Sequence, residues 1–207
     1  MSPLMERGNL QKELIGAQPI DVLTKILQLN PQIESVNICK YVYIPLRFQE
    51  DGNNDFWLSR NEILKENIIT TMIDSLQNNQ QLGIGSRVQL NSCEHAHIPL
   101  MDFNVPKNQQ NLNKVQERLK HIGFSNGWIL ETGESYHYWG NKILTEKEWI
   151  DFMGRCLLTS IVHTRQNIEE VADSRYIGHS LRRGFNTLRI TTRADKSFVP
   201  TVVSFLG

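Results

Sequence analysis

The sequence predicts an α/β (α+β) domain with a mixed sheet flanked by helices, and three observations support this prediction. Segments with apolar residues at helical spacing alternate with short segments rich in β-branched and aromatic residues. Some of the strand-like segments are joined by short turns, as in hairpins. The chain of 207 residues contains no internal repeat and no Gly/Ser linker, so a single domain is expected.

The first third of the chain is expected to begin with a loosely held polar stretch, residues 1–15. Residues 19–29 carry apolar side chains at helical spacing and end at an Asn-Pro stop signal. Residues 35–47 are rich in Val, Ile and Tyr and predict a strand, which a polar, acidic loop at residues 50–54 follows. Ser59 is a suitable N-cap for a helix that runs to about Leu76.

The rest of the chain repeats this alternation, and we expect one domain with an N-terminal module of about residues 16–84 and a motif-bearing module of about residues 85–207. The expected elements are strands at 85–90 and 97–105, a helix from Asn111 to Gly123, a hairpin of 127–131 and 135–139, a helix from a capping box at Thr145 to about Leu158, a helix at about 168–183, and a closing hairpin of 187–192 and 198–205.

The charge of the chain is balanced overall but unevenly distributed. The sequence has 22 Lys and Arg against 22 Asp and Glu, which argues against a surface that binds polyanions everywhere. Residues 50–74 are mainly acidic, whereas residues 155–196 are rich in arginine. Arginine is suited to forked contacts with phosphate, although ordinary solvated helix and strand faces would explain the same charges.

The cysteine pattern and hydropathy indicate a cytoplasmic protein. Three widely spaced cysteines, Cys39, Cys93 and Cys156, fit a reducing compartment better than a disulfide framework. No apolar run reaches the roughly 20 residues that span a bilayer. The first residues also lack the basic and apolar regions of a signal peptide, so no membrane partner is expected.

Asp102 and Asn104 form the first candidate for chemistry. They end an apolar strand-like segment at a spacing of two, which puts both side chains on the same face of a strand. Their oxygens could then bind a hard cation such as Mg²⁺. An aspartate at the end of a strand is also common as a turn or cap residue.

Ser135 and His137 form the second candidate, because they share one face of a predicted strand. A hydroxyl and an imidazole side by side could contact a triphosphate. A serine nucleophile with its base is less favoured, because such a serine normally lies in a strained turn. A half-exposed strand with one hydrogen-bonded histidine is the structural alternative.

Asp173 opens the third candidate segment, which continues through several arginines into a strand-like stretch ending near Ile190. An acid followed by arginines offers a metal ligand next to groups that neutralise phosphate. Taken alone, the segment also fits an amphipathic helix with a basic face.

In this order, the three segments resemble the catalytic domains of the archaeo-eukaryotic primase (primase-polymerase) superfamily, in particular its bacterial primase-like proteins. The family's pattern is an acid-x-acid on a strand, then Ser-x-His on a strand, then a later acid before a basic, strand-forming stretch. Asp102-Phe103-Asn104 matches the first with one substitution, Ser135-Tyr136-His137 matches the second, and Asp173 is the best match to the third. The resemblance runs from about residue 85 to the C-terminus.

The resemblance implies an RRM-like sheet and a two-metal nucleotidyl transfer, with Mg²⁺ or Mn²⁺ as cofactor and nucleoside triphosphate as substrate. It implies nucleic acid as a partner, DNA more than RNA, in replication or repair, and a partner protein for helicase or accessory functions. The implied roles are metal binding by Asp102, Asn104 and Asp173, catalysis by Asp102, Asp173 and His137, and nucleotide binding by Ser135, His137, Arg182, Arg189 and Lys196.

Asn104 stands where the family usually has a second acid, and this departure supports an alternative function. A neutral amide is a poorer ligand for a divalent ion than a carboxylate. The alternative is a catalytically inactive primase fold that binds nucleotide or nucleic acid as a subunit of a larger complex.

A separate alternative is a zinc-dependent hydrolase or nuclease built on Cys93, His95 and His97, whose spacing places them on one side of an extended segment. Cys156 or His163 could supply a fourth ligand, but the usual spacing of structural zinc sites is absent. The four tryptophans are expected to line the core or a groove wall rather than to stack on bases; they are Trp57, Trp128, Trp139 and Trp149.

Overall fold

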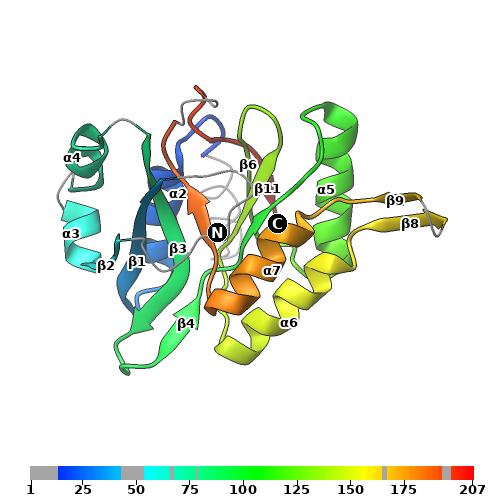
Figure 1. Ribbon diagram of the computed structural model, residues 1–207. Helices are drawn as coiled ribbons and strands as arrows, with labels where there is room; N and C mark the ends of the chain where they lie inside the picture. Colours follow the sequence, from blue (N-terminus) through cyan, green and yellow to red (C-terminus); the bar gives the residue numbers. More distant parts are fainter. Residues whose placement is uncertain (1–13, 43–53, 66–67, 78, 165–166, 193–196) are drawn as a thin grey trace, which may run out of the picture.

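The computed structural model describes residues 14–42, 54–65, 68–77, 79–164, 167–192 and 197–207 (Figure 1). In chain order the elements are α2 (Pro19–Leu29), β1 (Ile33–Val42), β2 (Asn54–Ser59), α3 (Arg60–Lys65), α4 (Ile68–Asp74), β3 (Gln80–Leu90), β4 (His95–His97), β5 (Leu100–Asp102), α5 (Gln109–His121), β6 (Gly127–Glu131), β7 (Tyr136–Gly140), α6 (Glu146–Leu157), β8 (Ile161–Thr164), β9 (Asn167–Glu169), α7 (Ser174–Arg183), β10 (Thr187–Arg189) and β11 (Thr201–Leu206).

Helices and antiparallel sheets together confirm the α+β class. The main strands form two sheets rather than one mixed sheet, and every strand pair in the described residues is antiparallel. In Figure 1, α3 and α4 lie at one end of the molecule beside β1 and β2, and α5, α6 and α7 lie at the other.

The first sheet has the strand order β10-β3-β1-β2, with β4 paired to β3. Its apolar face packs against α2, whose buried side chains recur at helical spacing and include Val22, Leu23 and Ile26. Ile38 of β1 and Ile84 of β3 lie opposite each other in this core. Burial of this amphipathic stripe, rather than helix propensity, holds α2 in place.

The second sheet has the order β11-β6-β7-β5 and is buried on both faces. Because strand side chains alternate, Trp128 and Leu130 of β6 enter the first core while Ile129 between them enters a second core. The second core is completed by α5, α6 and α7. The structure therefore has two cores with the second sheet between them. Three of the four tryptophans are fully buried, as expected for core residues: Trp128, Trp139 and Trp149. The fourth, Trp57, is partly exposed.

Two expectations about strands were wrong, because local patterns do not specify which sheet a strand joins. Residues 97–105 do not form one strand: β4 and β5 belong to different sheets, and Pro99 lies between them. Residues 187–192 and 198–205 do not form a hairpin either. Instead β10 pairs with β3 of the first sheet and β11 pairs with β6 of the second.

The expected helix over 168–183 was correct only in its second half. The segment begins as β9, which pairs with β8, and α7 starts after Asp173. The Asp173 carboxylate accepts the backbone N–H of Tyr176 at 2.8 Å, so an aspartate placed inside the predicted helix is instead its N-cap. Gly184, with φ of +75°, ends the helix directly after residue 183, the last residue of the expected range.

The helix expected after Ser59 is divided into α3 and α4, and residues 66 and 67 between them lie outside the described residues. Ser59 does cap α3, since its hydroxyl accepts the N–H of Glu62 at 3.3 Å and the Glu62 carboxylate accepts the N–H of Ser59 at 2.7 Å. The preceding residues form β2, a strand that the sequence did not indicate.

Most of the N-terminal stretch 1–15 and the end of the strand expected at 35–47 lie outside the described residues. The chain near its start is tied to β11, because the N–H of Gly16 donates to the carbonyl of Val202 at 2.8 Å. The expected module boundary near residue 84 falls inside β3. Within the described ranges, no helix combines the length and apolar character needed to cross a bilayer.

Candidate functional site

Asp102 and His137 face each other across two neighbouring strands. They are directly opposite in the β5–β7 register, and the His137 Nε2 atom lies 3.5 Å from the Asp102 Oδ1 atom. The histidine side chain is 5% exposed, whereas the aspartate side chain is 35% exposed. The pair therefore consists of a buried imidazole and a carboxylate that solvent and ligands can reach.

Asp173 joins this pair from the third segment. Its backbone N–H donates to the Asp102 carbonyl at 3.1 Å, and an isolated antiparallel bridge links the neighbouring residues Phe103 and Ala172. The segment before α7 thus continues the second sheet next to the end of β5. Asp102, His137 and Asp173, which are far apart in the sequence, lie together at this edge.

Asn104 has a carboxylate as its partner. Its side-chain amide donates to Glu170 Oε2 at 2.8 Å, and the other oxygen of Glu170 accepts the N–H of Ser174 at 3.0 Å. Burial would raise the pKa of Glu170, but the hydrogen bonds from Ser174 and Asn104 outweigh it and keep the pKa below its usual value. Position 104 carries no acid, but the carboxylate of Glu170 lies beside the Asn104 side chain. Nothing in the motif pattern points to Glu170.

Ser135 has a partner that the motif pattern does not suggest. Its hydroxyl donates to the Phe103 carbonyl at 2.6 Å and so ties the start of β7 to the end of β5. Because its proton is engaged there, this hydroxyl can accept a hydrogen bond from a ligand but has none to donate to a phosphate. In this structure Ser135 mainly aligns the two strands that carry Asp102 and His137.

The arginines and lysine expected to contact nucleotide are placed very differently. Arg189 is 7% exposed and donates to three carbonyls, those of Thr191, Phe198 and Thr132, at 2.6 to 2.8 Å. It joins segments of both sheets, so the expected phosphate contact is not supported by its position. Arg182 is exposed on α7, and Lys196 lies outside the described residues.

Two other arginines, Arg87 and Arg183, pack against the ring of Phe185. The guanidinium of Arg183 is 4.3 Å from the ring centroid of Phe185, and that of Arg87 is 4.9 Å from the same centroid. Arg183 also lies 3.6 Å from Asp55. Burial raises the pKa of Tyr176, and the positive charge of Arg183 opposes this. Arg183 was part of the basic segment in the sequence, but the pattern did not distinguish it from its neighbours.

Asp102 and Asp173 could supply some, but not all, of the ligands of a divalent metal ion. Among the residues that the structure describes, no three His, Cys, Asp or Glu side chains lie close enough together to hold a metal ion. The carboxylates of Asp102 and Asp173 nevertheless both act electrostatically on the Tyr176 hydroxyl. Mg²⁺ commonly uses only one or two protein carboxylates, with water and substrate phosphates as its other ligands. The donor set suits that arrangement rather than a cage of protein ligands.

The three residues of the zinc alternative do not act as a group. His97 is fully buried, with Nδ1 3.1 Å from Ser86 Oγ and Nε2 2.7 Å from Glu146, and its ring stacks on Trp149. Both ring nitrogens therefore already have partners. His95 and Cys93 are exposed. The Ser86–His97–Glu146 chain resembles a hydrolase triad, but Ser86 is fully buried and no substrate can reach it.

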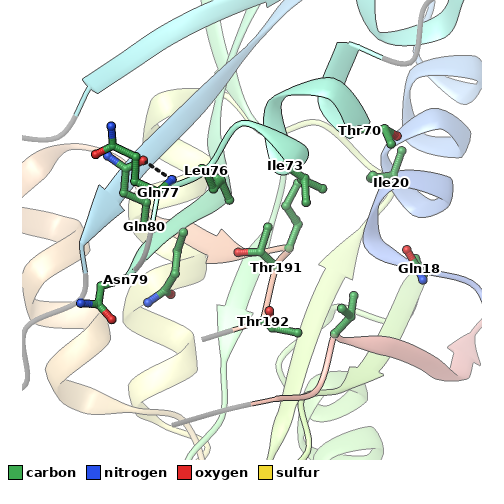
Figure 2. A pocket seen from close by; sticks show the side chains of 13 residues that line it. Gln18, Ile20, Thr70, Ile73, Leu76, Gln77, Asn79, Gln80, Thr191 and Thr192 are labelled. Atoms are coloured by element: carbon green, nitrogen blue, oxygen red, sulfur yellow. Dashed lines mark hydrogen bonds between the residues drawn. The ribbon is translucent and has the colours of Figure 1, made fainter. Parts of the chain in front are cut away.

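A groove of about 760 Å³ lies apart from these residues, between α2, α4 and the end of β10. Figure 2 shows Gln77, Asn79 and Gln80 at one end of the groove and Gln18, Ile20 and Thr70 at the other, with Ile73, Thr191 and Thr192 between them. The lining residues are all uncharged: Gln18, Ile20, Thr70, Ile73, Leu76, Gln77, Asn79, Gln80, Gln81, Ile190, Thr191, Thr192 and Val199. Such a lining offers no carboxylate for a metal and no cation for a phosphate.

Comparison with known proteins gives one match. The model of a family described as archaeo-eukaryotic primase 1D-like matches residues 60–201, which include the whole acid site. No curated protein and no solved structure gives a significant match to the chain.

Proposed function

The chain belongs to the archaeo-eukaryotic primase 1D-like family, and on this basis we propose that it is a primase-polymerase-like nucleotidyltransferase domain that binds nucleoside triphosphate and divalent metal and acts on nucleic acid. One observation carries the proposal. Asp102, His137 and Asp173 come from three distant segments and lie together at the edge of the second sheet, with the His137 imidazole 3.5 Å from the Asp102 carboxylate.

In the proposed reaction, the 3′-hydroxyl oxygen of a nucleic-acid strand forms a bond to the α-phosphorus of the nucleotide. The bond from that phosphorus to the bridging oxygen breaks, pyrophosphate leaves, and the hydroxyl proton passes to solvent. Asp102 and Asp173 would hold Mg²⁺ or Mn²⁺, which supplies neutralisation of phosphate charge and acidification of the hydroxyl when bound.

The chain's own residues orient the reactants. His137 lies against Asp102 and orients that carboxylate. Glu170 and Asn104 extend the polar edge on the far side of Asp102. Arg183 supplies a positive charge that opposes the effect of the acids on Tyr176. We propose DNA as the nucleic acid, and a partner protein for helicase or accessory functions in the cytoplasm.

The test is incorporation of labelled nucleotide on primed and unprimed templates, with Mg²⁺ and then Mn²⁺. Asp173→Asn is an informative variant because asparagine is also a good N-cap, so α7 should remain intact while the charge is removed. Incorporation should fall about 100-fold. Asp21→Asn, which changes an aspartate in the capping box of α2, is the matched control and should leave incorporation unchanged.

A folded wild-type protein that incorporates nothing on any template would contradict catalysis. The second candidate is then an inactive primase fold that binds nucleotide as part of a larger complex. It is favoured by Asn104, whose amide replaces an acid of the family's pattern, and by the absence of a three-ligand metal group from the described residues. Calorimetric binding of triphosphate that survives metal chelation would support this candidate.

A further inference from the structure

The helices α6 and α7 carry exposed apolar side chains that the acid site does not use. Ile150 and Leu157 of α6 are 51% and 43% exposed, and Leu181 of α7 is 40% exposed. Leu158, at the C-terminal end of α6, is 74% exposed. A single exposed leucine is common on a protein surface, whereas a group on adjoining elements is typical of a surface that another molecule covers.

The exposed apolar residues of α6 occupy a side of their own. Ile150, Gly154 and Leu157 are spaced at i, i+4 and i+7 and therefore share one side of the helix. On another side, Arg155 donates to the Ile122 carbonyl at the end of α5 at 3.3 Å. The side that enters the second core carries Trp149, Phe152, Met153 and Cys156. Ile150 and Leu157 therefore point away from both α5 and the core.

The exposed apolar side of α7 adjoins this side of α6. Arg183 lies 3.6 Å from Asp55 of the first sheet, and Gly178 and Leu181 are on the opposite side of α7, away from that sheet. The two helices pack against each other, and Figure 1 shows them side by side. We refer to the combined surface as the α6–α7 face, which consists of Ile150, Gly154, Leu157, Gly178 and Leu181.

The two glycines leave the middle of the α6–α7 face open. A Cβ at Gly154 or at Gly178 would meet no heavy atom within 4 Å. Neither residue has a positive φ, so the backbone does not require glycine at these positions. Glycine is also less favourable than alanine within a helix. A residue without a side chain does, however, allow the backbone of another helix to approach closely.

The edge of the face along α7 is positively charged. Arg175 and Arg182 are exposed and two helical turns apart, so they lie on the same side of the helix. Partial burial lowers the pKa of His179 between them, and the charges of both arginines lower it further. The helix itself contains no aspartate or glutamate. On α6, the carboxylate of Asp151 is paired with Arg155 at 2.7 Å. The α7 edge therefore suits a partner with negatively charged side chains.

We propose that the α6–α7 face binds an amphipathic helix of a partner protein, whose apolar side chains cover Ile150, Leu157 and Leu181 and whose acidic side chains lie along the α7 edge. An apolar helical stripe laid on an apolar face is a common mode of peptide recognition. A nucleic-acid strand fits the face less well, because the face has no aromatic ring on which bases could stack. The inference rests on the proposed function only in expecting a partner protein, and it does not require the acid site to be catalytic.

The first test measures binding of a synthetic helical peptide to the whole protein by fluorescence anisotropy. The peptide has leucines at i, i+3, i+4 and i+7 and alanines and glutamates at the other positions. The wild-type protein should bind it with a Kd of about 100 μM or lower. A peptide with lysines in place of the glutamates should bind about tenfold more weakly. Equal binding of both peptides, or no binding of the glutamate peptide at about 1 mM, overturns the proposal.

The second test fills the open middle of the face. Gly154→Gln and Gly178→Gln place a side chain where nothing is displaced and favour the helix, so the melting temperature should stay the same or rise. Affinity for the glutamate peptide should fall about tenfold in each variant. Leu29→Gln is the matched control, because it places the same side chain at an exposed position of α2, and it should keep the wild-type affinity. Wild-type affinity in both glycine variants overturns the proposal.

The third test reverses the charge of the α7 edge. The double variant Arg175→Glu, Arg182→Glu should prefer the lysine peptide to the glutamate peptide. Lys120→Glu, an exposed change on α5, is the control and should keep the wild-type preference. An unchanged preference in the double variant overturns the acidic chemistry that we propose for the partner.

Other occupants of the face would be revealed by the same variants. A wild-type dimer that Gly154→Gln dissociates, measured by sedimentation, would assign the face to a second copy of the chain and overturn the proposal. Binding of a single-stranded oligonucleotide, or of vesicles of phosphatidylcholine and phosphatidylserine, that Gly154→Gln abolishes would overturn it as well. Nucleotide incorporation by Gly154→Gln should equal that of the wild type, so the docking proposal and the proposed function can fail independently.

Discussion

His97 and His137 are both buried histidines next to a carboxylate, yet the structure gives them different roles. The His97 ring is fully buried, stacks on Trp149 with 4.6 Å between centroids, and has a partner at each nitrogen. The His137 side chain is 5% exposed and faces Asp102, which belongs to an edge where three distant segments meet. His97 has a partner at each ring nitrogen, whereas His137 faces an acid at an edge where three distant segments meet.

The comparison teaches that burial beside an acid does not by itself indicate catalysis. The network of His97 is fully satisfied when Nε2 carries the proton, because Nδ1 can then accept from Ser86 and Nε2 can donate to Glu146. Nothing in it requires a ligand. The edge around Asp102 brings together Asp102 and Asp173, two acids of like charge. Acids that converge from distant segments, rather than burial beside one acid, mark this edge as the candidate site.

The largest difference between the two environments should appear in activity. Asp102→Asn should lower nucleotide incorporation by about 100-fold or more, because it removes a charge that the proposed metal and phosphates require. Glu146→Gln, the equivalent change beside His97, should leave incorporation unchanged. The measurement is initial rate per folded molecule, with folding checked by circular dichroism. Equal losses in the two variants would refute the distinction.

The second difference should appear in stability. His97→Ala should lower the free energy of unfolding by about 3 kcal/mol, because it leaves a cavity beside Trp149 and removes the partners of Ser86 and Glu146. Urea unfolding measures this change. His95→Ala is the control, since His95 is the exposed histidine of the same strand and its loss should cost no more than about 0.5 kcal/mol. Similar costs for both variants would show that the His97 network is not structural.

A smaller effect is expected on the pH dependence of stability, which His97 should cause to decline at acidic pH. Burial lowers the pKa of His97 below 6.5, although the hydrogen bond and charge of Glu146 oppose this. The unfolded chain therefore binds a proton at His97 more readily than the folded protein does. The stability that neutral His97 contributes is complete above about pH 6.5 and is lost as the pH falls below that value. Urea unfolding of wild type and His97→Gln between about pH 7.5 and 5.5 should show a shallower decline in the variant. An identical decline would assign the pH dependence to other groups.

The smallest expected effect is that of Glu146→Gln on stability. The Glu146 side chain is 58% exposed, and glutamine keeps an oxygen that can accept from His97 Nε2. The free energy of unfolding should fall by about 0.5 kcal/mol, and the loss should shrink in high salt if charge causes it. A loss as large as that of His97→Ala would mean that His97 requires a full negative charge beside it.

Much of the local structure could be predicted from the sequence. The helix at 19–29, the hairpin of β6 and β7 and the capping box at Thr145 follow from periodicity and turn chemistry that act over a few residues. The acid and Ser-x-His motifs pointed to Asp102, His137 and Asp173, which the structure brings together. The pattern could not reveal Glu170, because its importance depends on a contact with a residue distant in sequence.

The sequence alone determined the α+β class, most helix ends and the order of the motif residues, because these depend on side-chain spacing and capping within one segment. Only the tertiary structure decided that β10 and β11 join different sheets, that Asp173 caps α7, and that the buried Arg189 holds strands together while Arg183 pairs with Asp55. The physical reason is that sheet pairing, burial and electrostatic neighbours are set by contacts between distant segments, which a local pattern does not encode.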